Sequence, residues 1–93
     1  MTGEDELDGV WDVHRTGGAL PPMHGVVCKW IEGGRGWTIA FGVRLPFVVD
    51  GLSLRYPLGL VDELVPSGPD AYAGTTRLFG RTVGTFRLTR SAR

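Results

Sequence analysis

The chain of 93 residues is poor in cysteine, histidine and lysine, and it carries no net charge. Its single cysteine, Cys28, cannot form an internal disulfide and lies in an apolar stretch, so we expect a small core residue. Two histidines with no spaced partner make a poor metal site, and no metal or cofactor is expected. Because the ten basic and ten acidic residues cancel, the chain has no electrostatic reason to bind nucleic acid or an anionic membrane.

Long apolar runs and helical periodicity are also missing from the sequence. No stretch approaches the roughly 18 apolar residues of a membrane helix, so we expect no membrane partner. The acidic first nine residues lack the apolar run of a signal peptide, which predicts a cytoplasmic location. The ratio of nine arginines to one lysine is consistent with a GC-rich bacterial genome.

What the sequence has in quantity is glycine. Fifteen glycines and six prolines divide it into short alternating segments, which is typical of an all-β protein with frequent turns. Strands are expected over residues 10–16, 26–32, 36–41, 45–49, 52–56, 61–65, 72–79 and 82–90. Segment 61–65 could equally form one helical turn. Gly33-Gly34 and Asp50-Gly51 predict tight turns, and residues 16–25 and 66–71 are the two expected longer loops.

The short connections predict that consecutive strands pair as antiparallel neighbours. The simplest closed arrangement is a small up-and-down barrel of about eight short strands, which removes its own sheet edges. A half-open sheet or a two-layer roll is the alternative. We expect one domain over residues 7–90, with residues 1–6 and 91–93 as flexible tails. Closure would bring the acidic residues of 1–12 beside the arginines of 71–93; the other interpretation of those arginines is a basic tail for nucleic acid.

The tripeptide Gly9-Val10-Trp11 opens the first strand, and Arg90 ends the last. In this the chain resembles the lipocalin and fatty-acid-binding (calycin) superfamily, whose barrels begin with glycine, any residue and tryptophan. The resemblance implies that Trp11 plugs the closed end with Arg90 across its ring, a contact worth roughly 0.5–2 kcal/mol. An up-and-down path brings Trp30 and Trp37 to the same end, so we expect all three tryptophans and Arg90 to form a structural plug.

The opposite, open end would carry an apolar rim with a few polar groups, the usual composition of a small-molecule site. The expected ligand-binding residues are Met23, His24, Phe41, Tyr56 and Phe79. We therefore expect non-catalytic binding of a small apolar or amphipathic ligand. The alternative is a solid barrel that acts as a protein-interaction or homodimeric structural module, through an apolar patch of the 16–25 loop that includes Leu20 and Met23.

No catalytic motif is present, and an enzyme is the third hypothesis. Asp62 and Glu63 form the only central acidic pair, but neighbours on a strand face opposite sides and cannot act on one substrate together. An inward carboxylate of this pair would need Arg44 or Tyr56 as a partner. An enzyme would have to combine His24 with an inward Asp62 or Glu63.

Overall fold

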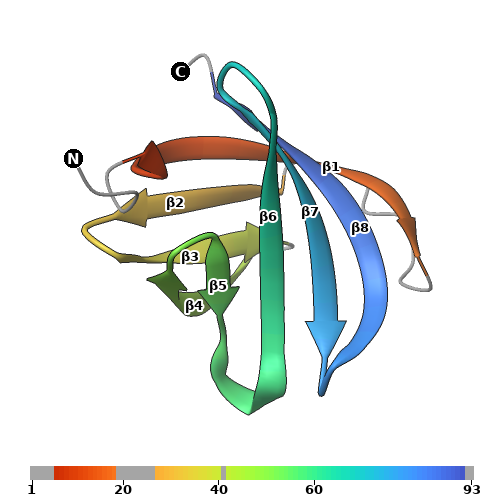
Figure 1. Cartoon of the computed structure of the whole chain (residues 1–93). Helices are drawn as coiled ribbons and strands as arrows, with labels where there is room; N and C mark the ends of the chain where they lie inside the picture. The colour runs from red at the N-terminus through yellow and green to blue at the C-terminus, as the bar shows by residue number, and fades with distance from the viewer. Residues whose placement is uncertain (1–5, 19–26, 41, 92–93) are drawn as a thin grey trace.

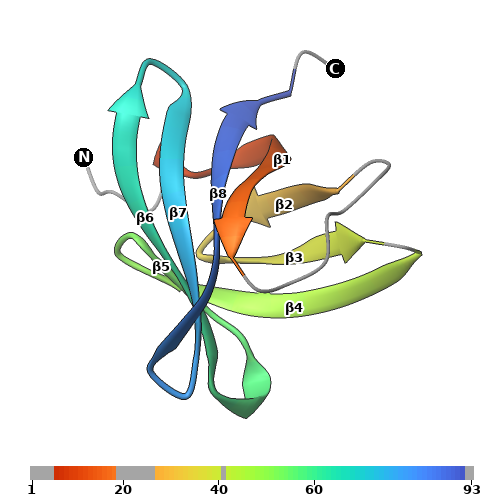
Figure 2. The ribbon, with the colours of Figure 1, turned by 90° about the vertical axis from the view of Figure 1, so that its right-hand side faces the viewer.

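The computed structural model describes residues 6–18, 27–40 and 42–91, which form an all-β barrel (Figure 1). Its elements are β1 (Gly9–Gly18), β2 (Cys28–Glu32), β3 (Arg35–Ala40), β4 (Val43–Asp50), β5 (Ser53–Arg55), the 3-10 turn η1 (Pro57–Gly59), β6 (Leu60–Gly68), β7 (Ala71–Leu78) and β8 (Arg81–Arg90). Each strand pairs antiparallel with the next, and β8 pairs with β1 to close the barrel. Strands β2 and β3 run across β6 and β7 in both views (Figures 1 and 2). The predicted up-and-down barrel is confirmed.

Glycines at the strand connections explain the short turns. Gly33 and Gly34 join β2 to β3 with φ angles of 63° and 83°, and Gly51 lies between β4 and β5 with φ of 63°. This left-handed region suits glycine because it has no Cβ to clash with the backbone. The turns predicted at these two places therefore follow from the sequence.

The connection between β6 and β7 is shorter than the predicted loop over residues 66–71. Strand β6 continues to Gly68, and its register with β7 shifts between Pro66 and Gly68. Proline has no N–H to donate to a regular ladder, so within a strand it is tolerated at an irregularity of this kind. The helical alternative for residues 61–65 is wrong, because Asp62 and Leu64 alternate inward as on a strand.

The closed end of the barrel, where β1 starts and β8 finishes, is packed with apolar side chains. Trp11 and Leu7 have no exposed surface, and the Trp11 Nε1–H donates to the Leu7 carbonyl at 2.9 Å. The Arg90 guanidinium lies 4.2 Å from the centre of the Trp11 ring and donates to the Asp70 carboxylate at 2.9 Å and the Asp8 carbonyl at 2.8 Å. Arg90 thus covers the buried tryptophan and links the end of β8 to the start of β1.

Trp30 and Trp37 do not join this packing, which corrects the expectation of a plug of three tryptophans. Lys29 and Ile31 of β2 point inward, so Trp30 between them points outward and is 49% exposed. Trp37 lies directly opposite Trp30 across β2 and β3 and is half-buried on the same outer face. The two tryptophans lie near the closed end, as the up-and-down path predicted, but the alternation of the strand decides whether a side chain faces inward or outward.

Parts of the prediction lie outside the described residues. These are the tails 1–5 and 92–93 and the stretch 19–26, which holds most of the expected loop 16–25. Among the described residues, no helix has the length and apolarity needed to cross a membrane.

Candidate functional site

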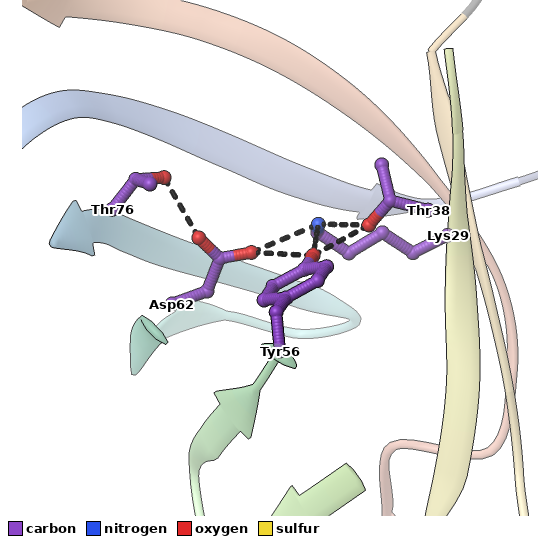
Figure 3. Close-up of polar contacts among 5 residues, drawn as sticks. All are labelled: Lys29, Thr38, Tyr56, Asp62 and Thr76. Carbon is purple, nitrogen blue, oxygen red and sulfur yellow. Dashed lines mark hydrogen bonds and ion pairs between the residues drawn. The ribbon is translucent and has the colours of Figure 1, made fainter. Parts of the chain in front are cut away.

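Five polar side chains meet inside the barrel and form what we call the interior cluster (Figure 3). The Lys29 ammonium donates to Asp62 Oδ2 at 3.0 Å, to Thr38 Oγ1 at 2.7 Å and to the Tyr56 hydroxyl at 2.7 Å. The Tyr56 hydroxyl donates to Asp62 Oδ2 at 2.8 Å, and Thr76 Oγ1 donates to Asp62 Oδ1 at 2.7 Å. The cluster therefore joins an ion pair to three hydroxyl groups.

Two cross-strand pairs and one tyrosine build the interior cluster. Lys29 of β2 lies directly opposite Thr38 of β3, and Asp62 of β6 lies directly opposite Thr76 of β7. Directly opposed residues share a face of the sheet, so each pair points inward together. The pairs approach from two sides, and Tyr56, which follows β5, reaches between them (Figure 3).

Burial dominates the electrostatics of the cluster. The side chains of Lys29 and Asp62 are only 4% and 5% exposed. Desolvation lowers the pKa of Lys29, and the nearby Asp62 carboxylate offsets part of that effect. Burial and the same carboxylate raise the pKa of Tyr56 far above its usual range, so its phenol stays a neutral hydrogen-bond donor. The Lys29 ammonium also lies 5.3–5.7 Å from the ring centres of Phe47, Tyr56 and Phe86, which adds cation–π attraction.

Asp62 and Glu63 face opposite sides, as the alternation predicted. Asp62 is buried with Tyr56, one of its two expected partners, whereas Glu63 is exposed and pairs with Arg77 at 2.8 Å. The other expected partner, Arg44, lies 5.6 Å from the ring centre of Trp37 instead. The two carboxylates therefore cannot act on one substrate together.

The expected ligand-binding residues are only partly described. Met23, His24 and Phe41 lie outside the described residues. Tyr56 points inward as part of the interior cluster. Phe79 is 77% exposed at the open end, in a turn with φ of 51°.

Beside the interior cluster, towards the open end, apolar side chains face inward and yet remain exposed. Leu45 of β4 lies opposite Thr38 and therefore points inward, but it is 43% exposed. Val43, two positions before it on the same face, is 55% exposed, and Leu78 of β7, opposite Leu60, is 39% exposed. We call Val43, Leu45 and Leu78 the apolar mouth. Leu45 lies opposite Thr38 and Leu78 follows Thr76 by two positions, so each of them borders one threonine of the cluster.

The roles of three cluster members were not predicted from the sequence: Lys29, Thr38 and Thr76. A period-two pattern could have found the lysine, because Val27, Lys29 and Ile31 alternate and both apolar neighbours are buried. The same pattern joins Asp62 to the buried Leu64. The threonines carry no comparable signal, because a threonine suits either face of a strand.

The described part of the chain holds no group of three or more histidine, cysteine, aspartate or glutamate side chains close enough to bind a metal ion. Comparisons with profiles of known protein families, with curated proteins and with solved structures find no significant match.

Proposed function

We propose that the open end of the barrel binds a small amphipathic molecule without catalysing a reaction. The observation that carries this proposal is the apolar mouth, where Val43, Leu45 and Leu78 face inward and are not covered by the described residues. Inward apolar side chains in a closed barrel are normally buried against one another, and those of the closed end are. An apolar ligand body would supply the missing contact.

The interior cluster favours a neutral polar group on that ligand. The charges of Lys29 and Asp62 cancel at 3.0 Å, and each N–H of the ammonium already has an acceptor. A charged ligand group brought beside them would lose its hydration without gaining an unpaired opposite charge. A hydroxyl or amide could instead exchange hydrogen bonds with the Tyr56 hydroxyl. The proposed ligand class is therefore a neutral alcohol or amide with an apolar chain.

A relation to the calycin superfamily is part of this proposal. What supports it is the closed meander of eight strands and the position of Arg90 across Trp11 at the closed end. In this interpretation the closed end is structural and the open end carries the ligand.

The binding proposal is tested with octanol and octanoate, which share an apolar chain and differ in charge. Octanol is expected to raise the melting temperature with increasing concentration, as a ligand of the folded state must, and octanoate to do so less. Leu45→Ser should weaken octanol binding about tenfold through lost apolar contact. Val48→Ser is the matched control, because Val48 lies on the same strand, faces outward and is 59% exposed.

Two results would contradict the proposal. One is an unchanged melting temperature at every octanol concentration that stays in solution. The other is an equal loss of octanol binding in Leu45→Ser and in Val48→Ser, because octanol would then bind somewhere other than the apolar mouth.

The second candidate function is a solid barrel that acts through protein contacts. The interior cluster favours it, because every member has a partner within the cluster and needs no ligand. Leu20 and Met23, the expected contact patch, lie outside the described residues. A homodimer of this kind would show a melting temperature that rises with protein concentration and does not respond to octanol.

A further inference from the structure

Four residues form one continuous row across the outside of the barrel. Val10 of β1 lies directly opposite Trp30 of β2, Trp30 opposite Trp37 of β3, and Trp37 opposite Pro46 of β4. We call Val10, Trp30, Trp37 and Pro46 the outer row. Directly opposed residues share a face, so all four point away from the interior. Adjacent strands lie about 4.7–4.9 Å apart, which gives the outer row a length of about 14–15 Å.

An open groove runs along part of the outer row. Its volume of about 760 Å³ falls in the range of about 300–1,000 Å³ that ligand sites occupy. Its side-chain lining combines apolar and charged groups from Asp8, Val10, Trp30, Glu32, Arg35 and Trp37.

The groove is held in shape by contacts of its own. The Asp8 carboxylate accepts a hydrogen bond from the Gly33 N–H at 3.2 Å, which fixes it beside the turn between β2 and β3. Arg44 lies 5.6 Å from the centre of the Trp37 ring on the other side of the row. Tryptophan is the residue type most enriched among strong binding contacts, and here two neighbouring indoles border one groove.

We propose that this groove is a docking site for a proline-rich peptide segment in the polyproline II conformation, with a basic residue placed at Asp8 and Glu32. Such segments bind grooves lined by aromatic side chains, because the preformed helix loses little entropy on binding. At about 3.1 Å per residue, some five residues of polyproline II span the outer row. Asp8 and Glu32 outnumber Arg35 in the groove lining, so its charge favours a basic residue.

The docking proposal is independent of the ligand proposed for the open end, because the outer row and the apolar mouth lie on opposite faces of the sheet. It is tested by calorimetric titration of the full chain with three synthetic peptides of ten residues. The first is oligoproline with a terminal arginine, the second has glutamate in place of the arginine, and the third is a glycine–serine peptide with the arginine. The first should bind most tightly, the second more weakly, and the third not measurably.

Variants then locate the site. Trp30→Ser should raise the dissociation constant of the arginine peptide roughly 30-fold, as expected for a strong interface contact. Val65→Ser is the matched control, because Val65 is 63% exposed on β6, outside the outer row, and its binding should match the wild type. Glu32→Lys leaves the row intact and should reverse the preference between the arginine and glutamate peptides.

Each remaining result would overturn the proposal. Absence of saturable binding of either proline peptide would do so, as would wild-type binding by Trp30→Ser. A dimer that forms with rising protein concentration and is lost in Trp30→Ser would show that a second copy of the chain covers the groove. Circular dichroism and melting of each variant confirm that the fold is kept.

Discussion

At the closed end the barrel interior is apolar, whereas further towards the open end it contains an ion pair. Trp11, Leu7 and Leu88 are fully buried at or near the closed end, and the indole N–H has a backbone acceptor. In the interior cluster, the side chains of Lys29 and Asp62 are almost as deeply buried as these apolar residues. Exposed apolar side chains follow towards the open end. One small core thus contains two kinds of packing.

The two regions depend on different physics. Apolar burial at the closed end stabilises in proportion to the area removed from water. A buried ion pair stabilises only while each charge keeps its partner, because an unpaired charge in the interior is costly. Substitutions at the closed end should therefore destabilise the protein through lost buried volume, and substitutions in the interior cluster through lost charge pairing.

The largest effect is expected from Trp11→Ala. Removal of a fully buried indole should lower the free energy of unfolding by about 3–5 kcal/mol, measured by urea denaturation. Trp30→Ala is the matched control, because Trp30 is half-exposed and should lose about 1 kcal/mol or less. Equal losses in the two variants would contradict the assignment of Trp11 as the structural plug.

A similar loss of about 3–5 kcal/mol is expected from Asp62→Ala, for a different reason. The substitution leaves Lys29 buried without its counter-charge. The double variant Lys29→Met with Asp62→Leu should recover much of the loss, because it removes both charges together. The volume lost in Trp11→Ala cannot be recovered in this way. Glu63→Ala, one position along on the exposed face, should change stability by about 0.5 kcal/mol or less. A double variant less stable than Asp62→Ala alone would show that packing, not pairing, dominates here.

The pH dependence of stability tests the buried Tyr56 phenol of the interior cluster. An unfolded tyrosine ionises near pH 10, whereas the raised pKa of Tyr56 keeps the folded phenol protonated. The folded state then holds more protons, so the free energy of unfolding should fall above pH 10 by up to about 1.4 kcal/mol per pH unit. Lys29 acts in the opposite sense: its pKa is lowered, so stability rises with pH between that value and 10.5.

Tyr56→Phe tests this by denaturation at several pH values between about 8 and 11. The variant should lose stability at neutral pH and show a smaller alkaline fall than the wild type. Part of the fall should remain, because the pKa of Tyr72 is raised as well, chiefly by burial. An alkaline fall of unchanged slope would mean that the Tyr56 phenol is not held neutral.

The smallest effect is expected from Arg90→Gln, about 1–2 kcal/mol. The change removes the cation above Trp11 and its ion pair with Asp70, but it leaves the indole buried. Arg55→Gln is the control, because Arg55 forms an exposed ion pair with Asp50. Melting temperatures of the two variants decide whether the stacked arginine matters more than a surface one.

The barrel could be predicted largely because strand alternation, turn residues and short connections agree with one another. Trp11 and Arg90 meet because the first and last strands of a closed meander must pair. The facing of Trp30 was missed because the up-and-down path predicts only that Trp30 lies near the closed end, whereas the alternation with the inward Lys29 and Ile31 turns it outward. The interior cluster was missed for the converse reason, since a lysine on a strand is usually assigned to the solvent face. Only the register of separate strands brings its members together.

Lys29 is the only lysine of the chain, and its side chain is 4% exposed. The folded barrel therefore offers almost no lysine amine to reagents in solution. Acylation of that amine would require the barrel to open, and the added group would block its closing. At reagent concentrations where acylation outpaces reclosing, the rate at which one acyl group appears on this residue would thus report the opening frequency of the barrel interior, without any engineered probe.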